Sequence, residues 1–188
     1  MCKAPNLKNI RLAYHPITSI EPYAFDHLQS LHWLDLSGNA VEQPMDLMTT
    51  HSLSMTSATN FSELSMSYWS NLKSFEPGFI SNIQPHACLD FLDSGIEIIS
   101  KEAFYDVFQT LASYDGDVTD IYRPPGRITF GRNPLKCGCD IKWIVEDPQM
   151  LKIIDDVSFD HRKPICEDGT FVSDLDLSIL EILCPDNK

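Results

Sequence analysis

The stretch "LHWLDLSGNAV", Leu31 to Val41, places its leucines, one asparagine and one valine at fixed offsets, in the pattern L-x-x-L-x-L-x-x-N-x-V. From Leu34 to Leu36 every second residue is apolar, which is the period of a β-strand with one buried face. Asn39 follows at the point where the chain must turn. Its amide can pair with turn backbone that would otherwise be buried without a hydrogen bond. The stretch therefore predicts a short strand that ends in an asparagine-stabilised turn.

The same pattern recurs along the chain. Leu7 precedes Leu31 by 24 residues, and "NIRLAYHPITSIEPYAF" aligns without a gap with "ACLDFLDSGIEIISKEAF". Asn133 takes the asparagine position in "ITFGRNPL", and "LSMSYWSNLKSF" is a degenerate copy. Copies at a fixed period predict stacked units that bury a shared core. These four copies occupy residues 9–25, 64–75, 87–104 and 128–135.

The pattern and its period resemble the leucine-rich-repeat family. The resemblance implies an α/β fold: a leucine-rich-repeat solenoid with a curved parallel sheet and a disulfide-bonded C-terminal cap. We expect irregular repeats without an N-terminal cap at residues 1–132, and a cysteine-rich cap at residues 133–188. Short helices are expected to start at Glu21–Phe25 and Ser100–Phe104, on the side opposite the sheet, with Ser100 as an N-cap.

Two cysteines lie one residue apart in "NPLKCGCDIKW". A direct bridge between Cys137 and Cys139 would close a small, strained ring. In an extended segment both side chains point the same way, so they can reach separate partners at Cys166 and Cys184. Four cysteines leave three connectivities open. A zinc site made of the same four residues is an alternative, but C-x-C lacks the paired spacing usual in such sites.

The segments "DIKWIVEDPQML" and "CEDGTFVSDLDLSILEILC" follow this cysteine pair. Together with it they resemble the C-terminal cap of extracellular leucine-rich-repeat proteins. More particularly, they resemble the cap of arthropod proteins related to the non-catalytic subunit of oplophorus-luciferin 2-monooxygenase. The resemblance implies the disulfides Cys137–Cys166 and Cys139–Cys184, and an accessory, non-catalytic role beside a catalytic chain. Trp143 is expected to pack in the core of this cap.

We expect the chain to bind a protein partner, for which a catalytic subunit is one candidate. The alternative is the truncated ectodomain of a leucine-rich-repeat membrane receptor. The sequence contains no G-x-S-x-G, Walker or G-x-G-x-x-G motif, so we expect no enzymatic activity, no cofactor and no metal. The residues expected to face a partner from the sheet are Arg11, Ala13, Asp35, Ser37, Asp90 and Thr129.

Paired cysteines indicate an oxidising compartment, so we expect a secreted, extracellular protein. A cytosolic chain with reduced thiols is the alternative. Met1 is followed by repeat sequence without a signal peptide, so we expect the true N-terminus to lie upstream. Asn60 begins the sequon "NFS" and is a candidate glycosylation site in a secreted chain.

The chain is acidic, with a formal net charge of -13. Residues 137–188 contain twelve Asp or Glu and five Lys or Arg, a net of -7. This charge argues against nucleic acid as a partner, because phosphates would be repelled. No apolar run is long enough to span a membrane.

Three other features of the sequence support less specific predictions. "DGDVTD", residues 115–120, offers carboxylates for calcium but lacks the spacing of an EF-hand loop, so we expect an inserted loop. Cys88 is expected to be buried as a small apolar residue. Cys2 has no evident partner.

Overall fold

The computed structural model describes most of the chain in five segments. Cys2 and residues 118–120 of the "DGDVTD" stretch lie outside them. The described segments are residues 4–17, 19–39, 47–117, 124–155 and 160–185.

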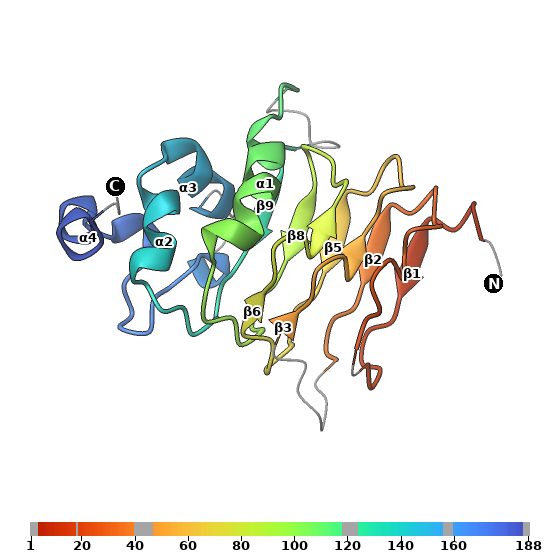
Figure 1. The fold of residues 1–188 in the computed structure, drawn as a ribbon, viewed down its shortest axis with the longest axis horizontal. Helices are drawn as coiled ribbons and strands as arrows, with labels where there is room; N and C mark the ends of the chain where they lie inside the picture. Colours follow the sequence, from red (N-terminus) through yellow and green to blue (C-terminus); the bar gives the residue numbers. More distant parts are fainter. Residues whose placement is uncertain (1–3, 18, 40–46, 118–123, 156–159, 186–188) are drawn as a thin grey trace.

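A parallel sheet of five strands forms one side of the molecule (Figure 1). The strands follow one another in the sheet in the order β1-β2-β5-β8-β9, which is also their order in the chain. Each strand is three residues long and pairs in register with its neighbours. Their bounds are β1 Asn9–Arg11, β2 Trp33–Asp35, β5 Glu63–Ser65, β8 Cys88–Asp90 and β9 Arg127–Thr129.

The middle residue of each strand points into the core. Four of these five side chains are at most 1% exposed, and the fifth, Ile10 on the edge strand β1, is half-buried. The alternation predicted from the repeated pattern is therefore present, because a strand buries every second side chain on one face. The inward row consists of Ile10, Leu34, Leu64, Leu89 and Ile128.

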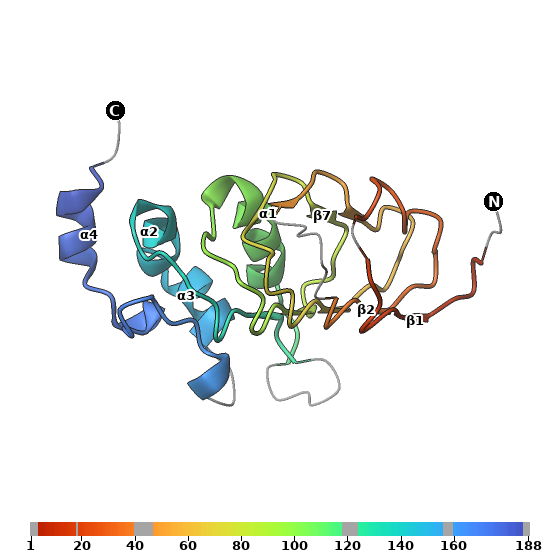
Figure 2. The same cartoon turned by 90° about the horizontal axis from the view of Figure 1, so that it is seen from below.

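Two short parallel pairs and one helix close the opposite side of the molecule (Figure 2). Strand β3 (Leu47–Met48) pairs with β6 (Ser74–Phe75), and β4 (Leu53–Ser54) pairs with β7 (Ile80–Ser81). Helix α1 spans Lys101–Ala112. Between these elements and the sheet lies a cluster of aromatic rings with centroids 4.5–6.3 Å apart: Phe75, Phe79, Phe91, Phe104 and Phe130.

The two expected helix starts behave differently. The Ser100 hydroxyl accepts a hydrogen bond from the backbone N–H of Ala103, so the predicted N-cap of α1 is confirmed. The expected helix at Glu21–Phe25 is wrong. That segment forms hydrogen-bonded turns, and Tyr23 has a φ of 62°, which a right-handed helix does not allow.

Each strand of the sheet is followed by a turn that contains a residue with positive φ. After β2, β5, β8 and β9, the side chain of the next residue donates to backbone carbonyls. The amide of Asn39 donates to the carbonyls of Leu12 and Leu36. Asn133 donates to the carbonyls of Phe91 and Phe130, at 2.8 Å each. The positive-φ residues at this place are Tyr14, Gly38, Tyr68, Asp93 and Arg132.

Two turns use other side chains in the asparagine place. The Nε1–H of Trp69 donates to the carbonyl of Leu36 at 2.5 Å. The Ser94 hydroxyl donates to the carbonyl of Met66 at 2.7 Å. Both acceptors lie one turn earlier in the sheet, as they do for the asparagines. A ladder of side-chain hydrogen bonds, which we call the turn ladder, thus connects successive turns through Asn39, Trp69, Ser94 and Asn133.

The C-terminal region packs against the last strand. The structure joins Cys137 to Cys166 and Cys139 to Cys184, the pairing that the resemblance implies. With all four sulfurs in disulfides, none is left to ligate zinc. The helices are α2 (Cys139–Val145), α3 (Pro148–Asp155) and α4 (Leu177–Leu183), with 3-10 turns at Asp160–Arg162 and Val172–Asp174.

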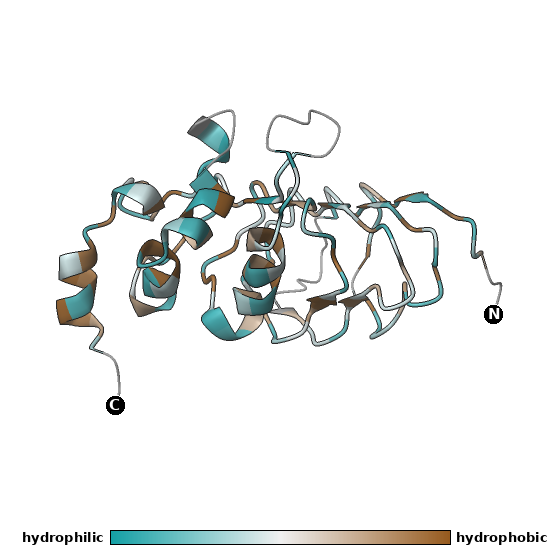
Figure 3. Cartoon of the chain, turned by 90° about the horizontal axis from the view of Figure 1, so that it is seen from above, coloured by the Kyte–Doolittle hydropathy of each residue, from teal (hydrophilic) through white to brown (hydrophobic). Residues whose placement is uncertain are grey.

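Trp143 on α2 anchors this region to the rest of the fold. It is 6% exposed, its ring centroid lies 4.9 Å from that of Phe108 on α1, and its Nε1–H donates to the carbonyl of Ile99. Helix α4, at the far end of the molecule, leaves Ile179, Ile182 and Leu183 exposed (Figure 3). None of the helices in the described segments has the length and apolar character needed to cross a membrane.

Replacing Asn133 with Ala is expected to lower the free energy of unfolding by about 3 kcal/mol or more. Its carboxamide oxygen accepts from the N–H groups of Ser94 and Ile96, so the change leaves two N–H groups and two carbonyls buried without partners. Urea unfolding measures the effect. Asn71→Ala, at an exposed position, is the control. Similar stabilities of the two variants would contradict the turn ladder.

Trp143→Ala is expected to cost about 3–5 kcal/mol, because it removes a buried ring from the contact with α1. Trp143→Phe keeps an aromatic ring but leaves the Ile99 carbonyl unpaired, so it should cost less, about 1–3 kcal/mol. Thermal unfolding of both variants separates packing from hydrogen bonding. Equal losses would show that the ring itself contributes nothing.

Candidate functional site

The candidate site is the solvent-facing side of the five-stranded sheet, which we call the outer sheet face. It is made of the first and third residues of each strand, since these point away from the core. In-register pairing aligns them in two rows that run across the strands. The first row is Asn9, Trp33, Glu63, Cys88 and Arg127, and the second is Arg11, Asp35, Ser65, Asp90 and Thr129.

Four residues predicted from the sequence to face a partner fall in the second row, and Ser65 completes it. Arg11 is exposed, and its Nε lies 3.2 Å from the Asp35 carboxylate. That carboxylate also accepts from the N–H of Ser37, and Asp35 is only 6% exposed. Asp35 therefore stabilises the strand end and holds Arg11, and it offers little surface of its own.

Ala13 and Ser37 belong to the turns just beyond the strands. Ala13 is half-buried, whereas Ser37 is 9% exposed and its hydroxyl lies 2.6 Å from that of Ser65. A partner at this edge would therefore contact Ala13 more readily than Ser37.

The C-terminal region overlies the β9 end of the face. Arg162 Nη1 lies 4.0 Å from the Asp90 carboxylate. Gly131, just after β9, lies so close to the backbone of His161 and Arg162 that a Cβ there would collide with both. Thr129 is 2% exposed. Of the predicted set, Arg11, Ala13 and Asp90 thus remain accessible to a partner.

A small cavity of about 110 Å³ lies on this face between β5, β8 and β9. Cys88, Glu63 and Arg127 line it from the first row, and Asp90 and Arg162 line it from the other side. Its walls carry two carboxylates and two guanidinium groups. The cavity therefore has balanced charge and room for a single side chain of a partner, because a binding site for a whole small molecule is usually several times larger.

Cys88 does not pack in the core as expected. It lies on the outer sheet face, half-buried, as a free thiol between Glu63 and Arg127. Burial raises the pKa of the Cys88 thiol, Arg127 acts in the opposite direction, and Glu63 and Asp90 raise it further. The first position of the strand points outward, which the two-residue period predicts once the strand's register is known.

Two exposed tyrosines at the strand ends were missed by the sequence analysis. Tyr14 is 73% exposed and has a φ of 60°. Tyr68 is 45% exposed and has a φ of 65°. The ring of Tyr14 lies over Gly38, the equivalent residue of the next turn, where a Cβ would collide with it. Bulky residues are rare in this backbone region. Their presence at two turns gives the face an aromatic edge.

No group of three or more His, Cys, Asp or Glu residues that could hold a metal ion occurs within the described segments. Asp115 and Asp117 of the "DGDVTD" stretch are exposed. The side chains described on the outer sheet face offer hydrogen bonds, ion pairs and aromatic contacts.

Comparison with known proteins first identifies the class of repeat. Residues 3–43 match the family model "Leucine rich repeat". This range contains β1, β2 and the turns after them. The match confirms the predicted resemblance to leucine-rich repeats for this part of the chain, where β1 and β2 pair in register.

A particular relative can also be named. The chain is similar to the oplophorus-luciferin 2-monooxygenase non-catalytic subunit of Oplophorus gracilirostris, with 23% identity over 181 residues. The alignment covers 96% of this chain and 43% of the relative. The chain thus spans less than half of that protein's length. The similarity that the C-terminal cysteine pattern predicted is confirmed.

Alkylation of Cys88 by iodoacetamide is expected to reach half its maximal rate at a higher pH than in a free cysteine peptide. The thiolate is the reactive form, and a raised pKa means that it forms only at higher pH. Mass spectrometry of a Cys2→Ser background follows the reaction at this one free thiol. Arg127→Gln should move the profile further upward. A midpoint at or below that of the peptide would contradict the burial of Cys88.

Proposed function

We propose that the chain is a leucine-rich-repeat solenoid that binds a protein partner through its outer sheet face, as a non-catalytic accessory subunit. The observation that carries the proposal is the in-register alignment of five strands, which holds two rows of side chains on one rigid surface. Repeat proteins use such extended sheet surfaces for binding. The relative's name, a non-catalytic subunit, supports a role beside a catalytic chain.

The chemistry of the face favours a protein over a polyanion. Trp33 on β2 is half-exposed, and Arg11 and Tyr14 lie exposed on the neighbouring repeat. Tryptophan, tyrosine and arginine are the residues that most often dominate the energy of protein interfaces. Asp35, Glu63 and Asp90 add carboxylates to the same face, which would repel phosphates.

We further propose that residues 133–188 form a cap on the repeats of residues 1–132. A stack of repeats leaves an apolar end that must be covered, and α2 places Trp143 against α1 there. The two disulfides fit an extracellular location, since such bonds persist in oxidising compartments. Asn60, exposed beside Thr59, is sterically open to glycosylation in that setting.

Co-purification of the tagged chain from the extracellular fluid of its source organism tests the proposal. We expect a companion protein in fixed ratio that Arg11→Gln and Tyr68→Gly each weaken by about tenfold or more, as hot-spot residues do. Glycine is the residue best suited to the φ of 65° at position 68, so Tyr68→Gly should not lower the stability of the fold. Weakened binding by a variant that still folds would show that the replaced side chain contributes to binding and not to stability.

The matched control is Lys101→Gln, which removes the same charge as Arg11→Gln from α1, on the opposite side of the sheet. Binding that survives Arg11→Gln and Tyr68→Gly but fails with Lys101→Gln would move the interface to the helical side. Purification of the chain alone, with both disulfides intact, would refute an accessory role in that fluid.

A further inference from the structure

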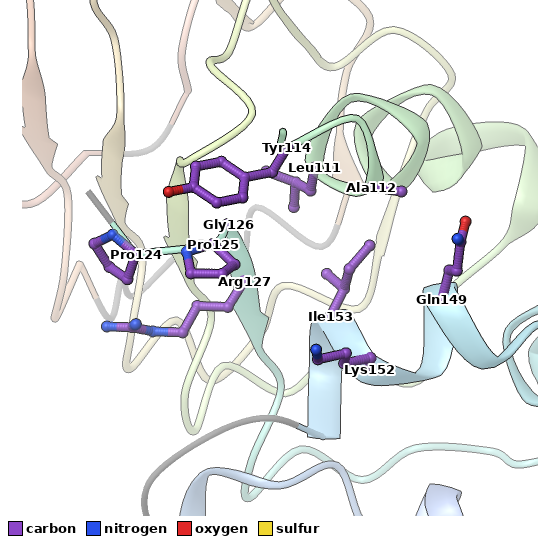
Figure 4. Close-up of a pocket in the computed structure, with 10 residues that line it drawn as sticks. All are labelled: Leu111, Ala112, Tyr114, Pro124, Pro125, Gly126, Arg127, Gln149, Lys152 and Ile153. Atoms are coloured by element: carbon purple, nitrogen blue, oxygen red, sulfur yellow. The ribbon is translucent and has the colours of Figure 1, made fainter. Parts of the chain in front are cut away.

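A second cavity lies where the repeats meet the C-terminal region, apart from the small cavity on the outer sheet face. Its volume is about 460 Å³, within the range of small-molecule sites. Lys152 and Ile153 project into it from α3, and Leu111 and Tyr114 approach from the end of α1 (Figure 4). Pro124, Pro125 and Gly126, just before β9, line the remaining side.

The charge of this cavity is opposite to that of the chain. Its charged lining residues are Arg127 and Lys152, and no Asp or Glu of the described segments lines it. In a chain with a net charge of -13, a cavity with only cationic charges is unexpected by composition. Cations beside a recess attract anions and disfavour a cationic ligand of the same shape.

Neither Arg127 nor Lys152 forms an ion pair with another residue of the described segments. Asp155 lies one turn after Lys152 on α3, but its carboxylate pairs with Lys163 at 3.2 Å. The charge of Lys152 is therefore available to a ligand, whereas that of Arg127 is shared with Glu63 and Asp90 of the small cavity on the outer sheet face.

The rest of the lining is apolar or aromatic. Leu111, Pro125 and Ile153 provide aliphatic surface, and Tyr114 adds a ring whose hydroxyl donates to the Asp117 carbonyl. Pockets of this composition hold the apolar body of a ligand, while a few polar groups fix its orientation.

Close backbone packing sets the shape of one wall. A Cβ on Gly126 would collide with the carbonyl of Pro85 and with the side chain of Leu111. The N–H of Gly126 donates to that same Pro85 carbonyl. The wall is therefore fixed against the preceding repeat, and the cavity is a built feature of the fold.

We propose that this cavity binds a small organic anion, whose carboxylate, sulfonate or sulfate group is held by Lys152, while Arg127 adds positive charge from the β9 side. An apolar or aryl body of the same ligand lies against Leu111, Pro125, Ile153 and the Tyr114 ring. This function goes beyond partner binding on the outer sheet face.

The test uses 1-anilinonaphthalene-8-sulfonate, an aryl sulfonate whose fluorescence rises in apolar surroundings. We expect the intact chain to bind it, and Lys152→Gln and Arg127→Gln each to weaken binding by about tenfold or more, as loss of a charged contact does. Ala112→Phe should abolish binding by filling the cavity, because Ala112 is part of the lining. The uncharged N-phenyl-1-naphthylamine should bind at least about tenfold more weakly than the sulfonate, because it cannot make the charged contact.

Two controls separate this cavity from other apolar surface. Lys8→Gln removes an exposed positive charge elsewhere, and Ile182→Ser removes the most exposed isoleucine of α4. Both should leave the affinity unchanged. Binding that is lost with Ile182→Ser, or that persists in both Lys152→Gln and Ala112→Phe, would overturn the proposal, and so would the absence of binding at about 1 mM probe. Lys152→Gln at an exposed helix position keeps the test valid if Ala112→Phe fails to fold.

Discussion

The parallel sheet depends on the turn ladder. After each strand the chain reverses within a few residues, and the turn carbonyls are buried away from water. Asn39, Trp69, Ser94 and Asn133 donate to these carbonyls from one turn to the next. A buried polar group left unpaired costs about 1–3 kcal/mol, so the ladder favours one spacing of the strands over all others. The rows of the outer sheet face follow from that spacing.

Only part of this ladder could be predicted from the sequence. Asn39 and Asn133 stand in a pattern that makes their role evident, whereas Trp69 and Ser94 supply the same donor from unrelated side chains. His15 occupies the equivalent place but is exposed, without a side-chain hydrogen bond to the rest of the described chain. The carbonyl of its own turn, that of Leu12, accepts from Asn39 instead.

The helix wrongly expected at Glu21–Phe25 also shows how the surrounding structure decides what a local pattern forms. The alignment of residues 9–25 with 87–104 is correct for the strands, yet only the second copy continues into a helix. The starts of β1 and β2 are 24 residues apart, and those of β8 and β9 are 39 apart. A twelve-residue helix fits the longer connection, whereas the shorter one has room only for turns. Local similarity predicted the strand but could not reveal the length of the connection.

The sequence could predict which strand side chains point outward. It could not predict which of them are covered by residues from distant segments. Arg162 and the backbone of His161 overlie the β9 end of a face whose strands lie earlier in the chain. The walls of the larger cavity come from three separate segments. Arg127 lines both this cavity and the outer sheet face beside Cys88. An anion bound beside Arg127 would therefore leave the face effectively more acidic, within a screening length of about 8 Å. By linkage, a partner that prefers the altered face must in turn strengthen binding of the anion. The two proposed sites are thus coupled through one guanidinium group.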